Sequence, residues 1–192
     1  NPCGEIPLCP YDSCRLLAIN LYSYVVNPFK PDAYFDFDLF KKHVALAQRI
    51  MDDIIDLELE KIERIMAKID SDPENEDVKH TESVLWQKIY KKSGQGRRTG
   101  VGITAEGDML AALGLRYGTE EATEFAEKVH QTVALSAYRS SVEMAKERGA
   151  FEVYDSEREK SNPFINRLRE ADPELYEEMK KYGRRNIAFL DR

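Results

Sequence analysis

The chain has 192 residues, of which 42% are hydrophobic and 33% charged, and its formal net charge is −7. This composition is typical of a folded domain, or of a large part of one, and excludes a wholly disordered chain. No run approaches the roughly 18 uninterrupted apolar residues of a membrane span, so we expect no membrane partner. An acidic chain without a dominant basic stripe also argues against a nucleic-acid polymer as partner.

The first fourteen residues hold all three cysteines, Cys3, Cys9 and Cys14, and the chain begins with Asn1 rather than with methionine. We interpret the sequence as a fragment of a longer protein. Three clustered cysteines cannot staple a whole domain, which favours a reducing cytoplasm in which the thiols do chemistry. Their spacing lacks a C-x2-C pair and no histidine is close by, so we expect no metal site here.

The elements at the start of the chain are predicted from turn residues and from the spacing of apolar residues. Residues 1–14 are expected to form an irregular loop, because three prolines and a glycine interrupt regular structure. The run from 16 to 26 is rich in β-branched and aromatic residues, which predicts a buried strand. Apolar residues then recur at helical spacing, which predicts one long or kinked helix over 37–69.

Most of the remaining chain is predicted to be helical. A polar helix is expected over 76–92, and a glycine-rich loop follows at 94–102. Thr119 is suited to cap a helix that reaches Arg148 and is closed by Gly149. The other predicted elements are a helix over 105–113, short helices that start at Asn162-Pro163 and Asp172-Pro173, and a strand that begins at 186.

The fold class predicted from these elements is part of an α/β unit, because a lone strand at each end of a helical block does not close a sheet. We expect a single partial domain, predominantly α-helical with one or two strands. Its parts are a loop over 1–15, a strand over 16–26, a helical region over 37–183 and the start of a strand over 186–192.

Asn1, Cys3 and Glu5 form the pattern most suggestive of chemistry. In an extended segment residues two apart point the same way, so the three side chains could converge on one substrate. The carboxylate can act as a base, the amide can hold oxygens, and the sulfur can be a nucleophile or a hydrogen-atom carrier. The neighbouring carboxylate disfavours a thiolate, which favours a neutral S–H group. The spacing alone is weak, since most such loops are structural.

NPCGEIPL, followed by DSCRLLAINL, resembles the catalytic subunit of ribonucleotide reductase. It is similar in particular to the adenosylcobalamin-dependent class II enzymes, whose active-site finger loop reads N-P-C-G-E. The resemblance continues through MDDIIDLELEKIERI, GRRTGVGITAEGDMLAALGLRYGTEEA and AKERGAFEVYD to RRNIAFL, and so covers essentially the whole chain. It implies a ten-stranded α/β barrel of two halves joined by the finger loop, of which this chain would be the central piece.

The resemblance also implies roles for individual residues. Cys3 matches the cysteine that becomes a thiyl radical and removes the 3′ hydrogen atom from the ribose. Glu5 matches the base that takes the 3′-hydroxyl proton, and Asn1 matches the amide that orients the reacting groups, so that all three would contact the substrate. Cys14 matches one of two cysteines that deliver reducing equivalents and end as a disulfide, its partner lying upstream of Asn1. Cys9 matches no functional cysteine of the family.

The cofactor and partners implied by the resemblance are adenosylcobalamin, a ribonucleotide substrate, the rest of the reductase chain, and an external thiol reductant of the thioredoxin or glutaredoxin type. The product would serve DNA synthesis. The resemblance leaves open whether the subunit forms a homodimer and whether its substrates are diphosphates or triphosphates. We expect the isolated fragment to be inactive. Two alternatives are a non-catalytic helical scaffold or assembly module derived from the same family, and a reductase whose radical comes from a partner subunit with an iron or manganese centre.

Three further patterns are interpreted as structural. Glu127 and His130 form a single E-x-x-H pair, whereas di-iron bundles need two such pairs, so a surface or partly buried histidine is expected. The segment 94–102 resembles a phosphate loop in composition, but it follows a helix and lacks the Lys-Ser/Thr ending. A contact of this segment with substrate or cofactor stays a minor hypothesis. A solvated acidic helix face, rather than a metal cluster, is expected for Asp52, Asp53, Asp56, Glu58 and Glu60.

Overall fold

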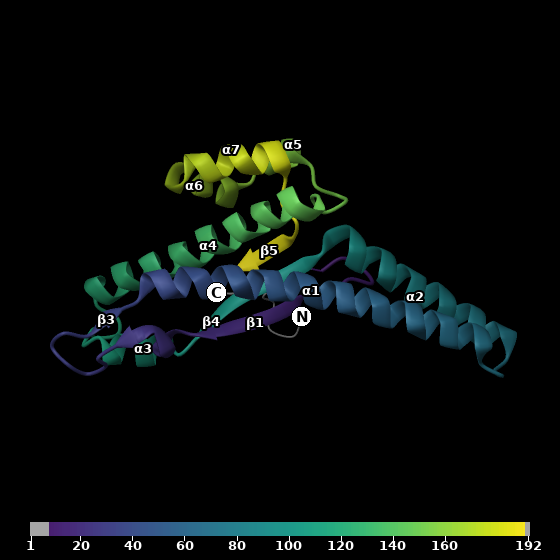
Figure 1. Cartoon of the computed structure of the whole chain (residues 1–192), viewed down its shortest axis with the longest axis horizontal. Helices are drawn as coiled ribbons and strands as arrows, with labels where there is room; N and C mark the ends of the chain where they lie inside the picture. The colour runs from purple at the N-terminus through teal and green to yellow at the C-terminus, as the bar shows by residue number, and fades with distance from the viewer. Residues whose placement is uncertain (1–7, 191–192) are drawn as a thin grey trace.

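The computed structural model describes the backbone of residues 8–190 and the side chains of residues 8–186. Its centre is a three-stranded sheet in the order β1-β4-β5, in which both pairs of neighbours run parallel. Two long helices, α1 (Phe37–Ser71) and α4 (Glu120–Arg148), pack against each other and cover one face of this sheet (Figure 1). The helices therefore provide the layer on which the strands bury their apolar side.

The three strands are far apart in the sequence. β1 spans Arg15–Asn20, β4 spans Arg98–Thr104 and β5 spans Ile187–Leu190, with Arg15 opposite Thr99 and Arg98 opposite Ile187. Parallel strands require long crossover connections, which the helices between them supply. The amino-terminal ends of all three strands consequently lie at the same edge of the sheet, where the loop that precedes β1 also arrives.

The prediction of a loop over 94–102 is wrong. Helix α2 (Glu76–Gly96) continues through the first glycines, and β4 begins two residues later as the central strand. Arg97, with φ of +43°, makes the turn between helix and strand. Glycine weakens an isolated strand, but β4 is hydrogen-bonded on both sides, and this tertiary pairing outweighs the low local propensity.

The predicted strand over 16–26 is too long. β1 ends at Asn20, whose side chain accepts a hydrogen bond from the backbone N–H of Tyr22 and caps a 3-10 helix, η1 (Leu21–Tyr24). The next two residues, β2 (Val25–Val26), pair antiparallel with β3 (Tyr34–Phe35) in a separate two-stranded sheet. The apolar run thus supplies two strands with a helical turn between them.

The predicted helices and the mainly helical character of the chain are confirmed. The number of strands differs: the described residues hold five strands, where one or two were expected. Asp36 caps α1, Asn75 caps α2, and Thr119 caps α4 through its hydroxyl. The remaining helices are α3 (Glu106–Ala112), α5 (Ser156–Glu159), α6 (Pro163–Ala171) and α7 (Pro173–Tyr182), of which α6 and α7 begin at the two predicted caps.

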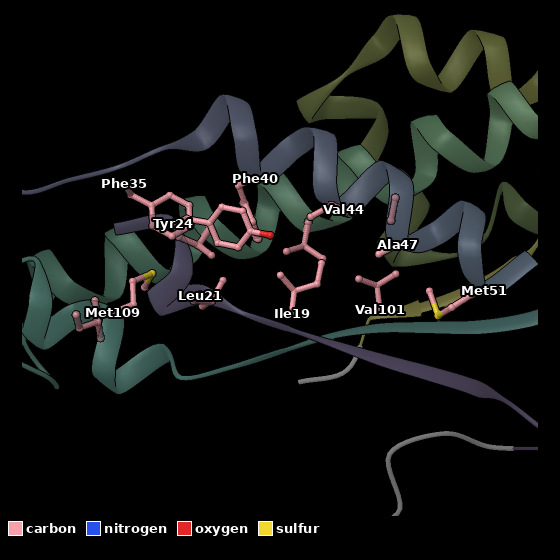
Figure 2. Close-up of a cluster of buried hydrophobic side chains, with 14 of the residues drawn as sticks. Ile19, Leu21, Tyr24, Phe35, Phe40, Val44, Ala47, Met51, Val101 and Met109 are labelled. Atoms are coloured by element: carbon pink, nitrogen blue, oxygen red, sulfur yellow. The ribbon is translucent and has the colours of Figure 1, made fainter. Parts of the chain in front are cut away.

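The main core lies between the sheet and the helix layer. Figure 2 shows Phe40, Val44 and Ala47 of α1 arranged above Ile19 and Val101 of the strands, with Met51 of α1 beside Val101, and all six are buried. Towards β3 the same cluster continues through aromatic side chains. A second cluster joins α4 to α6 and α7. These two clusters hold the strands and the long helices in one relative position.

Beyond the sheet, the second half of α1 and the whole of α2 run together as a helical hairpin (Figure 1). In the part of the chain that the structure describes, none of the helices is both long and apolar enough to cross a membrane.

Candidate active-site segment

Three of the predicted site residues, Asn1, Cys3 and Glu5, lie outside the described residues. Cys14 is described, and lies directly before β1 at the amino-terminal edge of the sheet. We call residues 8–15 the loop base, because they connect the predicted finger loop to β1. The loop base is therefore the part of the candidate site whose geometry the structure gives.

A tight turn forms the first half of the loop base. The backbone N–H of Asp12 donates to the carbonyl oxygen of Cys9 at 3.1 Å. Pro10 and Tyr11 are the central residues, and Tyr11 has φ of +65°, a combination typical of a type II turn. Lys88 of α2 lies with its Nζ 5.0 Å from the centre of the Tyr11 ring, close enough for a cation–π contact. This contact joins the turn to α2.

Asp12 forms an ion pair with Arg98, the first residue of β4. The two side chains are only 4% and 12% exposed, so the pair is shielded from water. The backbone N–H of Ser13 also donates to Asp12 Oδ1 at 2.9 Å. Arg98 Nη2 lies 3.8 Å from Cys9 Sγ, so the cysteine to which the sequence assigned no role contacts this ion pair.

Arg15 makes the second anchor of the loop base. Its Nε donates to Glu58 Oε2 of α1 at 2.7 Å, and its Nη2 donates to Ser93 Oγ of α2 at 2.6 Å. Its Nη1 reaches back to the carbonyl oxygen of Ser13 at 3.1 Å. A single buried guanidinium therefore ties the start of β1 to both helices of the hairpin and to the residue before Cys14.

The two faces of the sheet differ in character. Thr99 of β4 turns towards the helices, where its Oγ1 accepts a hydrogen bond from Gln48 Nε2 at 2.9 Å. Because side chains alternate along a strand, Arg98 and the glycines at 100 and 102 belong to the opposite face, which we call the open face. Leu16 lies on it opposite Gly100 and is 58% exposed, and Ala18 lies opposite Gly102. The open face thus combines the small residues Ala18, Gly100 and Gly102 with the exposed side chain of Leu16.

Cys14 is half-buried and its Sγ lies 3.9 Å from the carbonyl oxygen of Arg15. Arg15 turns towards the helices, so the alternation of an extended chain assigns its neighbour Cys14 to the open face. Asp12 and Arg98 meet on that same side. The structure thus brings Cys9 together with the Asp12–Arg98 pair, on the side of the sheet to which alternation assigns Cys14, and only Cys14 among these was a predicted site residue.

The interpretation of the acidic run on α1 as a solvated face is wrong for its first residue, Asp52. Asp52 is fully buried, and its Oδ1 accepts from Arg97 Nε at 2.8 Å and from Asn186 Nδ2 at 2.7 Å. Its Oδ2 accepts from Arg148 Nη1 at 3.2 Å and from Arg185 Nε at 3.3 Å. Three guanidinium groups from distant parts of the chain therefore converge on one carboxylate.

The neighbours of Asp52 extend this network. Asp53 accepts from Arg148 at 2.8 Å, and Asp56 accepts from Arg97 at 2.8 Å. The three carboxylates come within 4.8 Å of one another, a grouping that could hold a cation. Their charge is already balanced by three arginines, so the cluster needs no metal to be stable. The available sequence signal was that position 52 shares the helical spacing of the buried Gln48 and Ile55.

His130 agrees with the expectation of a surface histidine. Its Nε2 lies 3.4 Å from Glu106 Oε2 of α3, and the two side chains are 42% and 33% exposed.

Comparison with known proteins matches almost the whole chain to one protein family. Residues 1–191 match the family model described as "Ribonucleotide reductase, barrel domain". A vitamin B12-dependent ribonucleoside-diphosphate reductase of Thermoplasma acidophilum is 35% identical over 161 residues, which is 83% of this chain and 17% of the relative. The protein of the same name from Mycobacterium tuberculosis is 31% identical over 167 residues, 86% of this chain and 20% of the relative.

A ribonucleoside-diphosphate reductase subunit alpha of Chlamydia pneumoniae is 28% identical over 158 residues, 80% of this chain and 12% of the relative. The chain thus spans a fifth or less of the length of these relatives.

Proposed function

The chain belongs to the barrel-domain family of ribonucleotide reductases, and we propose that it is the central part of a cobalamin-dependent catalytic subunit. This subunit reduces ribonucleotides to deoxyribonucleotides for DNA synthesis. The observation that supports the proposal most directly is the match over residues 1–191, which includes the N-P-C-G-E segment. Two relatives above 30% identity are named as vitamin B12-dependent reductases, which supports the choice of cofactor.

Cys3, Glu5 and Asn1 form the reacting group in this proposal. Cys3 becomes a thiyl radical and takes the 3′ hydrogen atom from the ribose. Glu5 accepts the proton of the 3′-hydroxyl, a task that requires a carboxylate within hydrogen-bond reach of that hydroxyl. Asn1 holds the reacting oxygens through its amide, which both donates and accepts hydrogen bonds.

Cys14 supplies reducing equivalents together with a second cysteine elsewhere in the full-length subunit. The two thiols lose two electrons and two protons and form a disulfide, while the 2′-hydroxyl leaves the substrate as water and hydrogen takes its place. An external dithiol of the thioredoxin or glutaredoxin type then reduces the disulfide for the next turnover.

Adenosylcobalamin, when bound, supplies the radical through homolysis of its cobalt–carbon bond. At one end of the open face Ala18 lies opposite Gly102, so the sheet surface there carries no long side chain and leaves room for a bulky group. The residues of this chain that would lie nearest the reacting end of the cofactor are those around Cys3. Their part is to hold the thiol neutral and to orient it towards the ribose.

The test is a Cys3→Ser substitution in the full-length subunit, with Cys9→Ser as the matched control. Cys3→Ser should abolish deoxynucleotide formation without changing the folding measured by circular dichroism, whereas Cys9→Ser should remain active. Activity retained by Cys3→Ser would instead support the non-catalytic scaffold or assembly module.

The second candidate is a reductase that takes its radical from a partner subunit with an iron or manganese centre. The relative named "subunit alpha" is the observation that favours it. Absorption spectroscopy of the purified full-length subunit distinguishes the two candidates. A bound corrinoid with activity that depends on added adenosylcobalamin supports the first, and activity that requires a metal-containing partner supports the second.

A further inference from the structure

Two ion pairs flank Cys14, one on each side of the sheet. Asp12, two residues before it, pairs with Arg98 on the open face. Arg15, the next residue, pairs with Glu58 on the helix side and hydrogen-bonds Ser93. The chain is therefore fixed from opposite directions at positions only three residues apart.

Both anchors are built to resist movement. The side chains of Arg15, Asp12 and Arg98 are 7%, 4% and 12% exposed, so water does not compete strongly for them, whereas Glu58 is 32% exposed. Arg15 Nη1 also donates to the carbonyl oxygen of Ser13, and Ser13 Oγ lies 3.5 Å from Glu58 Oε1. The residue between Asp12 and Cys14 is thus tied to the same cluster, which leaves the backbone at Cys14 little freedom.

We propose that the Asp12–Arg98 and Arg15–Glu58 pairs are a clamp of positioning residues that sets where the Cys14 thiol stands for disulfide formation. This inference rests on the proposed function of Cys14. A thiol that must meet both a substrate and a partner sulfur has to be held within a fraction of an ångström, and a displacement of about 1 Å can cost on the order of 100-fold in rate. In this assignment the guanidinium groups of Arg15 and Arg98 act through the backbone around Cys14, by holding it in place.

The test uses the full-length reductase with Arg98→Ala and Asp12→Asn. We expect Arg98→Ala to lower kcat by about 10- to 100-fold with external dithiol present, while KM for the ribonucleotide changes less than about twofold. The midpoint potential of the Cys14 pair, measured in glutathione buffers, should shift as well. Arg98→Lys should restore part of kcat, because it keeps the charge but not the fork of the guanidinium.

Arg49→Ala is the matched control. Arg49 also links two segments through a two-bond ion pair, with Glu147 of α4 at 2.7 and 2.8 Å, but it is remote from Cys14 in the sequence and lies on the exposed side of α1. It should leave kcat, KM and the midpoint potential unchanged. If Arg98→Ala does not fold, Asp12→Asn decides by the same criteria, because it removes the charge and keeps the size.

Three outcomes would overturn the clamp: an unchanged kcat in Arg98→Ala and Asp12→Asn, an equal loss in Arg49→Ala, or a raised KM with unchanged kcat, which would make Arg98 a substrate ligand. Cys14→Ser separates this inference from the proposed function. If Cys14→Ser still turns over with external dithiol, the role proposed for Cys14 is wrong. If it is inactive while the Arg98 and Asp12 variants are normal, only the clamp is wrong.

Discussion

At the scale of single residues, Asp52 is the buried carboxylate on which three arginines converge in the described part of the chain. It is fully buried and accepts hydrogen bonds from three arginines and from Asn186. Burying a charge is costly unless partners compensate it, and removing one member of such a group leaves the others uncompensated. The residues around Asp52 therefore depend on its charge more than on its volume.

Asp52→Asn should lower the local stability of α1 and β4 by about 3–5 kcal/mol, because three guanidinium groups would lose their shared counter-charge. Amide hydrogen exchange of these two elements in the full-length protein measures the change. Asp53→Asn is the control: its side chain is 52% exposed and meets one of the same arginines, so it should cost about 1 kcal/mol or less. Equal effects would show that burial of Asp52 is not the cause.

Tyr138 gives a prediction for alkaline pH. Burial raises the pKa of its phenol above the ordinary value of 10.0, and the nearby Arg184 opposes this shift only in part. Above about pH 10 the unfolded chain can release this proton while the folded chain holds it, so stability falls as the pH rises. Tyr138→Phe should reduce the loss of stability between pH 8 and pH 11.

Urea unfolding at the two pH values measures the Tyr138 effect. Tyr117→Phe is the matched control, because Tyr117 is 78% exposed in the folded chain. A pH dependence that is the same in Tyr138→Phe as in the unsubstituted protein would contradict the prediction.

At the scale of elements, a glycine at a helix end can be required by its backbone conformation, by the side chains packed against it, or by both. Gly183 ends α7 with φ of +75°, and a Cβ added there would lie 2.6 Å from the Cβ of Ala150. Gly149, which ends α4, also combines a positive φ of +85° with an extended ψ of +156°, close to the ψ of −164° at Gly183, but it has open space around it. The two glycines therefore separate backbone strain from steric overlap.

Both Gly183→Ala and Gly149→Ala should destabilise the protein by about 1–3 kcal/mol through backbone strain, because positive φ with extended ψ is a conformation that only glycine adopts readily. Gly183→Ala should cost about 1–3 kcal/mol more, because Ala150 must move to accept the methyl group. Thermal unfolding of the two variants under the same conditions gives the comparison. Equal losses would mean that the segment around Ala150 yields without cost.

At the scale of the whole molecule, the chain spans a fifth or less of its relatives' length and carries one three-stranded parallel sheet. One face of this sheet is packed on helices, while Leu16 on the other face is 58% exposed. Parallel sheets are normally covered on both faces. The open face is therefore where further parts of the full-length subunit are expected to pack.

The isolated chain of 192 residues, supplied with adenosylcobalamin, ribonucleotide and a dithiol, should form no deoxynucleotide. The reason is that the proposed reaction needs a second cysteine beside Cys14 and a cover over the open face. The full-length subunit assayed in parallel is the positive control. Turnover by the isolated chain, measured by chromatography of the products, would contradict the proposal.

The sequence by itself determined those features that depend on neighbouring residues. Apolar spacing and caps such as Thr119 predicted the helices, and the N-P-C-G-E segment predicted the family. Caps and turns could be predicted because their hydrogen bonds join residues only two to four positions apart. The roles of Asn1, Cys3 and Glu5 remain predictions, since these residues lie outside the described part of the chain.

Only the tertiary structure decided which distant residues meet. The glycine-rich residues 98–102 have weak local propensity for a strand, and they belong to the central strand because partners more than 80 positions away hydrogen-bond it on both sides. In the sequence Asp52 looks like one more charge on a polar helix, and only the folded chain shows that Arg97, Arg148 and Arg185 contact it. Helical spacing can indicate that position 52 is buried, but it does not indicate which arginines reach it, because the energy of these contacts comes from desolvation and pairing between elements that folding alone brings together.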